Sequence, residues 1–477
     1  MARRRPSRMN PSFAALDFGA TSGRVIIGEL ESGRVRMREA GRFANSPVTI
    51  GGRMHWDVLS LWDSAITHLR DAVRADRGLL SVATDTWGVD YGLFRRGRML
   101  SNPVHYRDER TLEQVDRVHA RVAAAEIYAI AGTHSLPINT IYQLASDASE
   151  GAIECADTAL LMPDLFTYWL SGERIAERTI ASTTSLMNAR TGEWDARLLQ
   201  AAETDATLLP PIVPPGTSLG AATAEVAEAI GTSVEVVAVG AHDTASAVAA
   251  IPMTGEGSAF VSCGTWGLVG VERDEPVLTE RSRTAGFTNE SGIDGRHLLM
   301  RNGMGLWMLS ESIRLWETER GPVDLLSLLA AAGTVDRRLA VVDVDDPVFQ
   351  TPGDMPARIA AWCAERGLPM PVGMAETARC IIDSLAQSFA DAALESTSLT
   401  GQTLARIHIV GGGSRNALLC QQLAARAGVP VFAGADESTA LGNILVQARA
   451  MGELSGTLDD LRAVAARTVA PKRYAPR

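Results

Sequence analysis

The sequence predicts an α/β protein built from two duplicated domains, and three observations support this fold class. The chain has 477 residues, more than one hydrophobic core usually accommodates. Strand-like and helix-like segments alternate along it. Two segments, 13–29 and 258–272, also share one pattern: an apolar strand, a glycine, a threonine within two residues, a second glycine and another apolar strand. A duplication would explain that pattern.

The boundary between the halves is expected near 251–257, where the chain reads IPMTGEG. This gives an N-terminal domain over 13–253 and a C-terminal domain over 254–460, flanked by tails over 1–12 and 461–477. The N-terminal tail is basic but has no apolar core behind it. It therefore reads as a disordered tail and not as a secretory signal.

In the first half, alternating apolar and polar residues predict a β-meander with a glycine-rich first turn, and helical spacing follows it. A proline-rich segment further on is expected to be a surface loop. The expected elements are strands over 13–18, 24–30 and 34–43, a helix over 57–75, a strand over 79–88, helices near 111–131, 140–149 and 162–171, a loop over 208–220, a strand over 234–240 and a helix that opens with DTASAVAAI.

The second half is expected to begin with another meander at residue 258. Its last part reads strand, glycine loop, helix, an order that suits nucleotide binding. After the meander, the expected elements are a strand near 296–302, helices over 304–317, 322–332 and 374–397, a strand, loop and helix over 405–428, the strand VPVFAG and a helix from about 437.

Composition narrows the class of protein. Hydrophobic residues make up 46% and charged residues 21% of the chain, and the net charge is −11. An acidic balance argues against a nucleic-acid or anionic-membrane partner, and no apolar run approaches the ~20 residues of a membrane span. The five cysteines show no metal-binding spacing, so a reduced, cytoplasmic protein is expected. Cys363 and Cys380 could pair only if the fold brings them together.

Three glycine-containing loops are candidates for phosphate binding. In LDFGATSGR, glycines let backbone N–H groups approach an anion, Thr21 and Ser22 add hydroxyl donors, and Asp17 could hold a metal through water. CGTW at 263–266 and IVGGGSRN at 409–416 could form similar loops. For the first two, a hairpin with an Asx-type cap and a plain β-turn are the local alternatives.

The alternative for the third loop is a dinucleotide-binding turn. That pattern requires G-x-G-x-x-G/A, but Asn416 occupies the position of the third glycine. The acidic residue that the pattern also requires, about twenty residues further on, is present as Asp436. The chain has a single lysine, Lys472, near its C-terminus. A Walker-type ATPase or a protein kinase needs a lysine on the phosphates, so both are excluded. ATP would have to be held by glycine loops and a bound metal.

Two further segments contain carboxylates that could bind a substrate or act on it. DTWGVDYG places Asp85 and Asp90 around a tryptophan at a strand end, which suits a small polyol such as a sugar, or else forms a hairpin with exposed acids. In VGAHDTASAV, a lone carboxylate lies among small apolar residues, a costly placement unless it is paired or used. Asp243 could cap the following helix. It could equally act as a general base kept ionised at a helix N-terminus, and the two roles are compatible.

Taken together, these motifs resemble the FGGY family of carbohydrate kinases. The resemblance runs from about residue 13 to 453 through LDFGATSGRV, HWDV, DTWGVD, PVHYRDERT, NTIYQL, LLMPD, YWLSG, AHDTASAV, SCGTW, NGMGLWML, ARCIIDSLA, HIVGGGSRN and STALGNI. It implies two ribonuclease-H-like domains, of the type shared with actin, around a central cleft. It also implies ATP, Mg²⁺ and a ketose, with transfer of the γ-phosphoryl group to the 1-hydroxyl of L-rhamnulose, in a monomer or a homodimer.

The resemblance also assigns roles to residues of this chain. Asp243 would accept the proton, and Asp17 and Asp243 would place Mg²⁺. The sugar would be contacted by Asp85, Gly88, Asp90, His242, Asp243, Thr244 and Asn302. The nucleotide would be held by Ala20, Thr21, Ser22, Gly23, Arg24, Thr265 and Gly412. One departure is Ser310, where the family often has a glutamine at the ATP edge, and this departure bears on nucleotide affinity.

The sequence leaves three alternative functions open. A kinase of the same fold could act on L-fuculose, L-xylulose or D-xylulose. An NAD-dependent oxidoreductase could use the 411–413 loop. A sugar sensor could keep the fold and bind sugar without turning over ATP, although the intact Asp17, Asp243 and glycine loops argue against it.

Overall fold

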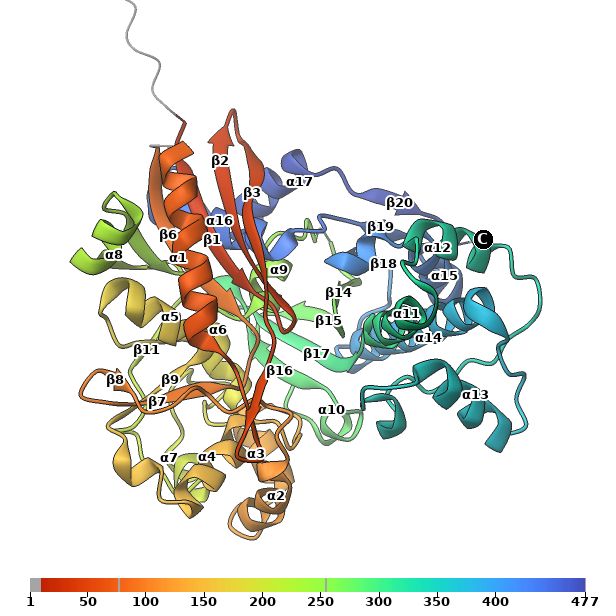
Figure 1. Ribbon diagram of the computed structural model, residues 1–477, viewed down its shortest axis with the longest axis horizontal. Helices are drawn as coiled ribbons and strands as arrows, with labels where there is room; N and C mark the ends of the chain where they lie inside the picture. The colour runs from red at the N-terminus through yellow and green to blue at the C-terminus, as the bar shows by residue number, and fades with distance from the viewer. Residues whose placement is uncertain (1–9, 76–77, 254, 477) are drawn as a thin grey trace, which may run out of the picture. The chain divides into compact units, whose positions relative to one another are not determined.

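The structure, a computed structural model, describes residues 10–75, 78–253 and 255–476 and divides into two compact units (Figure 1). Unit 1 comprises the chain up to Pro252 together with Arg273–Leu298 and Thr439–Thr468. Unit 2 comprises Met253–Glu272, Leu299–Ser438 and Val469–Arg477. Among the described residues, no helix is both long and apolar enough to cross a membrane.

The main sheet of unit 1 has six strands in the order β12-β13-β6-β1-β2-β3. The central strands β13, β6 and β1 are parallel, and β2 and β3 continue from β1 as the antiparallel meander that the sequence predicts. The bounds are β1 Ser12–Phe18, β2 Ser22–Glu31, β3 Arg34–Ala44, β6 Leu79–Thr86, β12 Thr217–Ala221 and β13 Glu235–Ala238. All seven residues of β1 are buried, as expected of a strand covered on both faces.

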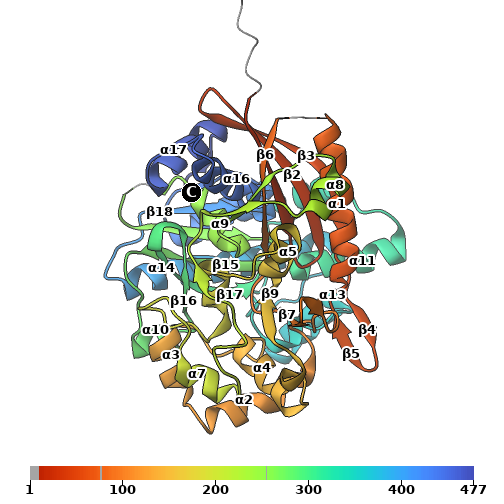
Figure 2. The same cartoon turned by 90° about the vertical axis from the view of Figure 1, so that its left-hand side faces the viewer.

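Helices cover both faces of this sheet (Figures 1 and 2). Helix α1 (Val58–Ala75) lies along β2 and β3, where Gly41 leaves room for His68. On the other face lies α16 (Ser438–Ala450), and a Cβ on Gly28 of β2 would come within 2.6 Å of Ile444. Helices α5 (Met162–Ser171) and α8 (Ala224–Ile230) pack with α1, whereas α9 (Asp243–Ala249) packs with α16 and α17 (Leu458–Thr468).

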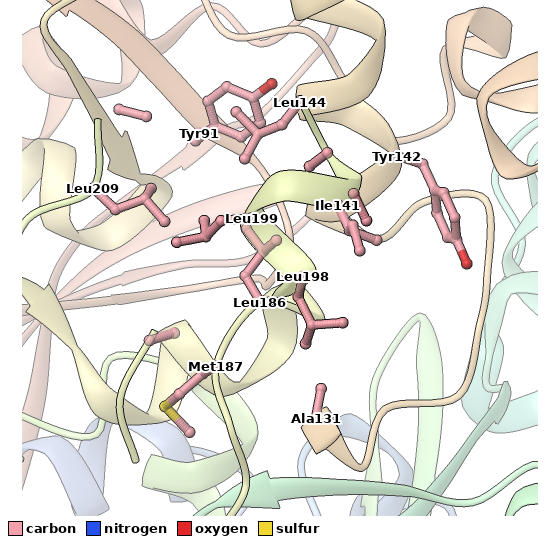
Figure 3. Close-up of a cluster of buried hydrophobic side chains, with 14 of the residues drawn as sticks. Tyr91, Ala131, Ile141, Tyr142, Leu144, Leu186, Met187, Leu198, Leu199 and Leu209 are labelled. Carbon is pink, nitrogen blue, oxygen red and sulfur yellow. The ribbon is translucent and has the colours of Figure 1, made fainter. Parts of the chain in front are cut away.

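A smaller, mainly helical part of unit 1 has its own hydrophobic core (Figure 3). Tyr91, Ile141, Leu144, Leu186 and Leu199 are among the buried side chains that meet there. Its elements are β7 Tyr91–Arg95, β8 Arg98–Met99, β9 Thr158–Leu161, α2 Leu112–His119, α3 Ala124–Ala131, α4 Thr140–Ser149 and α7 Ala196–Ala201. The short elements β4 Val48–Ile50, β5 Arg53–His55, β10 Ala176–Glu177, β11 Ile212–Val213, α6 Arg178–Ala181, α10 Glu280–Thr284 and β16 Thr288–Ser291 complete unit 1.

In unit 2 the strands follow the order β17-β15-β14-β18-β19-β20. The hairpin of β14 and β15 is the second meander expected from the sequence, and the long helix α14 lies against α15 (Figure 1). The bounds are β14 Ser258–Cys263, β15 Trp266–Arg273, β17 His297–Met304, β18 Arg406–Val410, β19 Val431–Ala433, β20 Lys472–Tyr474, α11 Trp307–Arg320, α12 Leu325–Gly333, α13 Met355–Glu365, α14 Gly373–Leu399 and α15 Ala417–Ala427.

Most predicted elements are present, with two differences. The segment 208–220, predicted as a loop, contains β11 and most of the edge strand β12, because β12 gains its hydrogen bonds from the distant β13. The segment 461–477, expected as a tail, carries most of α17 and the whole of β20. The disordered tail expected over 1–12 falls mainly on residues 1–9, which lie outside the described residues.

Cys363 and Cys380 are both free thiols and form no disulfide.

Candidate active site

The carboxylates of unit 1 gather where its parallel strands end. Asp17 and Asp85 are register neighbours on β1 and β6. The segment after β13 continues alongside, because Thr86 N–H donates to the carbonyl of Ala241 at 2.9 Å. Asp243 follows two residues later. The carboxyl ends of parallel strands are where α/β sheets bind ligands.

Asp243 is the first residue of α9, and the residue in the N-cap position is His242. The capping role considered for Asp243 is therefore wrong: its Oδ1 accepts a hydrogen bond from the Thr244 hydroxyl at 3.1 Å. Burial raises the pKa of Asp243, while the neighbouring His242 acts to lower it. The side chain remains 34% exposed, so a substrate hydroxyl can reach a carboxylate whose pKa has moved toward neutrality, as a general base requires.

His242 lies between two carboxylates. Its Nδ1 is 2.9 Å from Oε2 of Glu290, and its Nε2 is 3.4 Å from Oδ1 of Asp243. Burial lowers the pKa of His242, but these carboxylates, Glu290 above all, outweigh burial and raise it to about 9. The two carboxylates therefore favour the protonated form of His242. Glu290 was not among the residues that the sequence predicted for the site.

Glu177 is a second buried acid that sequence reasoning missed. Its Oε2 accepts hydrogen bonds from the backbone N–H groups of Thr179 at 2.9 Å, Ile180 at 3.3 Å and Ala241 at 3.1 Å. Thr179 Oγ1 in turn accepts from the N–H of His242 at 3.1 Å. Glu177 thus both caps α6 and fixes the backbone that leads into Asp243. Burial raises its pKa to about 7 despite these donors.

The first glycine loop joins β1 to β2. Asp17 forms an ion pair with Arg24, with Oδ2 and a guanidinium nitrogen 2.6 Å apart. A Cβ on Gly23 would lie 2.3 Å from the ring of Phe43, so only glycine fits there. Between them, Ala20 and Ser22 are half-buried and Thr21 is exposed. The loop is therefore a hairpin turn, with Asp17 held inside the end of its strand.

Asp85 is fully buried and belongs to a polar network that reaches α16. Asn443 donates its amide to Oδ2 of Asp85 at 2.6 Å, and Gln447 donates to Asn443 at 2.6 Å and to the carbonyl of Ala14 at 2.9 Å. Burial, reinforced by the charge of Asp17, raises the pKa of Asp85 well above its ordinary value. The Oδ1 atom has no hydrogen-bond partner among the described residues.

Asp90 is also buried, and its carboxylate is satisfied by the protein itself. Oδ2 accepts from the indole N–H of Trp56 at 2.6 Å and of Trp87 at 3.0 Å, while Oδ1 accepts from Gln143 at 2.9 Å. Burial nevertheless raises the pKa of Asp90 to about 6. The exposed-acid alternative for DTWGVDYG is therefore wrong, because both of its aspartates are buried.

The turn between these two aspartates is strained. Val89 has φ = 69°, a left-handed conformation that is rare for a β-branched residue. Its N–H donates to Thr183 Oγ1 at 3.1 Å and its carbonyl accepts from Thr140 Oγ1 at 2.6 Å. A Cβ on Gly88 would lie 3.0 Å from the same Thr183 oxygen. Strain held in place by surrounding contacts is frequent at ligand sites.

The remaining predicted residues belong to unit 2. Thr265 lies in the β14–β15 turn, and its carbonyl accepts from the N–H of Gly305 at 3.1 Å. Gly412 is exposed in the turn after β18. A Cβ on the preceding Gly411 would lie 2.9 Å from the Cys263 carbonyl, so the turns at 263–265, 305–306 and 411–413 are packed together.

Asn302 on β17 and Ser310 on α11 are both exposed. Asp436, the acid that a dinucleotide site would use, instead forms an ion pair with Arg415. Unit 2 therefore brings Thr265 and Gly412 into one cluster of turns, and unit 1 gathers Asp17, Asp85, His242, Asp243 and Thr244.

A strand-end carboxylate site in one α/β unit and packed glycine turns in another are typical of the two-domain sugar kinases. The models of the N-terminal and C-terminal domains of the FGGY family of carbohydrate kinases match residues 13–250 and 259–451. The chain therefore belongs to the FGGY family, and it is an ATP-dependent sugar kinase.

Individual relatives agree with this assignment. The chain is 35% identical to the rhamnulokinase of Bacteroides thetaiotaomicron over 472 residues, which cover 98% of this chain and 96% of that protein. Among solved structures, it is similar to a xylulose kinase from Lactobacillus acidophilus, with a TM-score of 0.80 at 17% identity, covering 98% and 94% of the two chains. It is also similar to the glycerol kinase of Plasmodium falciparum with ADP, with a TM-score of 0.77 at 15% identity and the same coverage. These two structures share the fold.

Proposed function

We propose that this sugar kinase transfers the γ-phosphoryl group of ATP to the 1-hydroxyl of L-rhamnulose. The observation that carries the substrate assignment is the 35% identity to a rhamnulokinase over 98% of the chain. In the reaction the hydroxyl oxygen bonds to the γ-phosphorus, the bond from that phosphorus to the β–γ bridging oxygen breaks, and the hydroxyl proton leaves. The products are L-rhamnulose 1-phosphate and ADP.

Asp243 is the proposed acceptor of that proton. Its carboxylate is one-third exposed, lies beside His242 and follows directly from the backbone that Glu177 fixes. A positioned base contributes about 10²–10⁴-fold to such reactions. We further propose that Gly88, Asp85, Asp90, His242, Thr244 and Asn302 determine sugar binding. Because Asp85 and Asp90 are buried, they would act by holding the turn between them.

We propose that the nucleotide is held by residues 20–24, Thr265 and Gly412. Mg²⁺ commonly takes one or two carboxylates and completes its shell with phosphate oxygens and water. The strand ends of unit 1 suit that arrangement, because Asp17 lies at the end of β1 and Asp243 follows the segment that pairs with the end of β6. The described residues form no cage of three or more His, Cys, Asp or Glu side chains. Asp17 and Asp243 would hold the ion, which would neutralise phosphate charge.

The decisive experiment measures ADP release with Mg-ATP and each of five acceptors: L-rhamnulose, L-fuculose, L-xylulose, D-xylulose and glycerol. We expect strong turnover with L-rhamnulose alone. A preference for another ketose would refute the substrate assignment. If none of the five acceptors supported ADP release, the proposed activity would be refuted. D243N should fold normally and lose about 10²–10⁴-fold in kcat. Wild-type turnover in D243N would remove Asp243 as the base.

A further inference from the structure

Glu290 has a placement that the family comparisons do not explain. It lies on β16, a four-residue strand whose members Thr288, Asn289, Glu290 and Ser291 are all buried although all are polar. A buried carboxylate is costly unless it is paired. The partner that the structure gives Glu290 is the imidazole of His242, with Nδ1 and Oε2 2.9 Å apart.

The backbone around Glu290 is fixed from both sides. Asn289 N–H donates to the carbonyl of Gly132 at 2.8 Å, and Asn289 Oδ1 accepts from the N–H of Val277 at 2.7 Å. On the other side, Ser291 N–H donates to Ser182 Oγ at 2.9 Å. These bonds do not involve the Glu290 side chain. The carboxylate is therefore presented to His242 from a rigid strand, and its removal leaves the anchors of the strand in place.

The backbone of His242 is anchored independently of Glu290. Its N–H donates to Thr179 Oγ1 at 3.1 Å, and it forms a parallel bridge with Thr86. These contacts fix the main chain but leave rotation about the side-chain bonds free. The contact from Nδ1 to Glu290 restricts that rotation, and it leaves the Nε2 edge of the ring toward Asp243 at 3.4 Å. A contact that restrains one edge of an imidazole decides which way the other edge faces.

We propose that Glu290 is a positioning residue for sugar phosphorylation: through the 2.9 Å contact between its Oε2 and Nδ1 of His242, it holds the ring so that Nε2 faces Asp243 and the acceptor hydroxyl. The inference rests on the proposed function, in that the sugar binds beside His242 and Asp243. The role depends on an oxygen at the Oε2 position, in contact with Nδ1. Glutamine places an oxygen at the same reach, alanine has none, and aspartate is one methylene too short.

The test compares E290A, E290Q and E290D with the wild-type enzyme, measuring kcat, KM for L-rhamnulose and KM for ATP. Loss of this close polar contact at a buried site should lower kcat/KM for the sugar by about 10–100-fold in E290A. E290Q should keep about one third or more of wild-type kcat/KM, and E290D should fall close to E290A. KM for ATP should stay within about twofold throughout. S291A, on the same strand, serves as the control and should match wild type.

Thermal unfolding confirms that each variant is folded, and if E290A does not fold, the comparison of E290Q with E290D decides. Wild-type sugar kinetics in E290A, equal losses for sugar and ATP, or E290D outperforming E290Q would each overturn the proposal. If the wild-type enzyme prefers another ketose, the same comparison is made with that ketose. If it turns over no sugar, the proposed function fails separately, and calorimetric binding of L-rhamnulose to the same variants still measures the role of Glu290.

Discussion

Glu177 offers a prediction whose magnitude follows from the structure. The fully buried carboxyl has its pKa raised by burial from an ordinary 4.5 to about 7. The folded state therefore binds this proton more tightly than the unfolded state does. Its contribution to stability is fully present below about pH 4.5 and is lost as the pH rises to about 7. At about 1.4 kcal/mol for each tenfold change in affinity, the loss amounts to about 3 kcal/mol.

The perturbation is Glu177→Gln. A glutamine oxygen can still accept from the backbone N–H groups of Thr179 and Ala241, but the side chain stays neutral at every pH. The variant should therefore not show the loss of folding stability that wild type shows as the pH rises. Burial and the charge of Glu177 raise the pKa of nearby Asp164. Removing that charge lowers the pKa of Asp164, which adds to the gain in stability of the variant over wild type as the pH rises.

The measurement is urea unfolding of wild type and E177Q at pH 4.5, 5.5, 6.5 and 7.5, followed by tryptophan fluorescence. The stability of the variant relative to wild type should rise by about 3 kcal/mol across this range. Groups that titrate equally in both proteins cancel in the difference. The exposed Glu173→Gln serves as the control and should track wild type. Parallel curves for wild type and E177Q would refute the reasoning.

Two further predictions concern the backbone. Gly442→Ala would place a Cβ 1.8 Å from the carbonyl oxygen of Ser246, so α16 must shift away from α9 at a cost of about 1–3 kcal/mol. Differential scanning calorimetry should show a lower Tm for Gly442→Ala than for wild type. The control is Gly333→Ala, whose added Cβ meets no atom within 4 Å and should leave the Tm unchanged. An unchanged Tm in Gly442→Ala would contradict the contact. Val89→Gly should change the unfolding free energy by less than about 1 kcal/mol, because relief of left-handed strain offsets the entropy of glycine. It should raise KM for the sugar as the turn loosens, and a destabilisation above about 2 kcal/mol would show that Val89 was not strained.

The part of the site that could be predicted from sequence is the part that follows strand ends. Asp17, Asp85 and Asp243 each come at the end of an apolar run, and period-2 alternation locates such runs without tertiary information. Glu177 and Glu290 could not be found in this way, because their burial depends on segments far away in the chain. The available signal was local: Glu177 precedes Arg178-Thr179 as a helix cap would, and Glu290 lies in a polar strand.

The fold shows the same division. Helix α1 and strand β6 follow from local periodicity, whereas β12 was missed because its hydrogen bonds come from β13, and its sequence resembles a turn-rich loop. The assignment of 273–298 and 439–468 to unit 1 also left no local trace in the sequence. Helix α16 has an ordinary helical pattern, and that pattern does not indicate that Asn443, Ile444 and Gln447 contact β6, β2 and β1.

The docking of α16 on the first sheet has a consequence for dividing the chain. A polypeptide that ends at residue 252 would lack Ile444, which fills the space above Gly28, and Gln447, which donates to the carbonyl of Ala14. It would also lack Glu290 and so leave His242 without its carboxylate. The two halves matched by the family models therefore do not coincide with the two compact units of the structure. We expect that, in a split version of this enzyme, the N-terminal fragment would fold only together with residues 273–298 and 439–468.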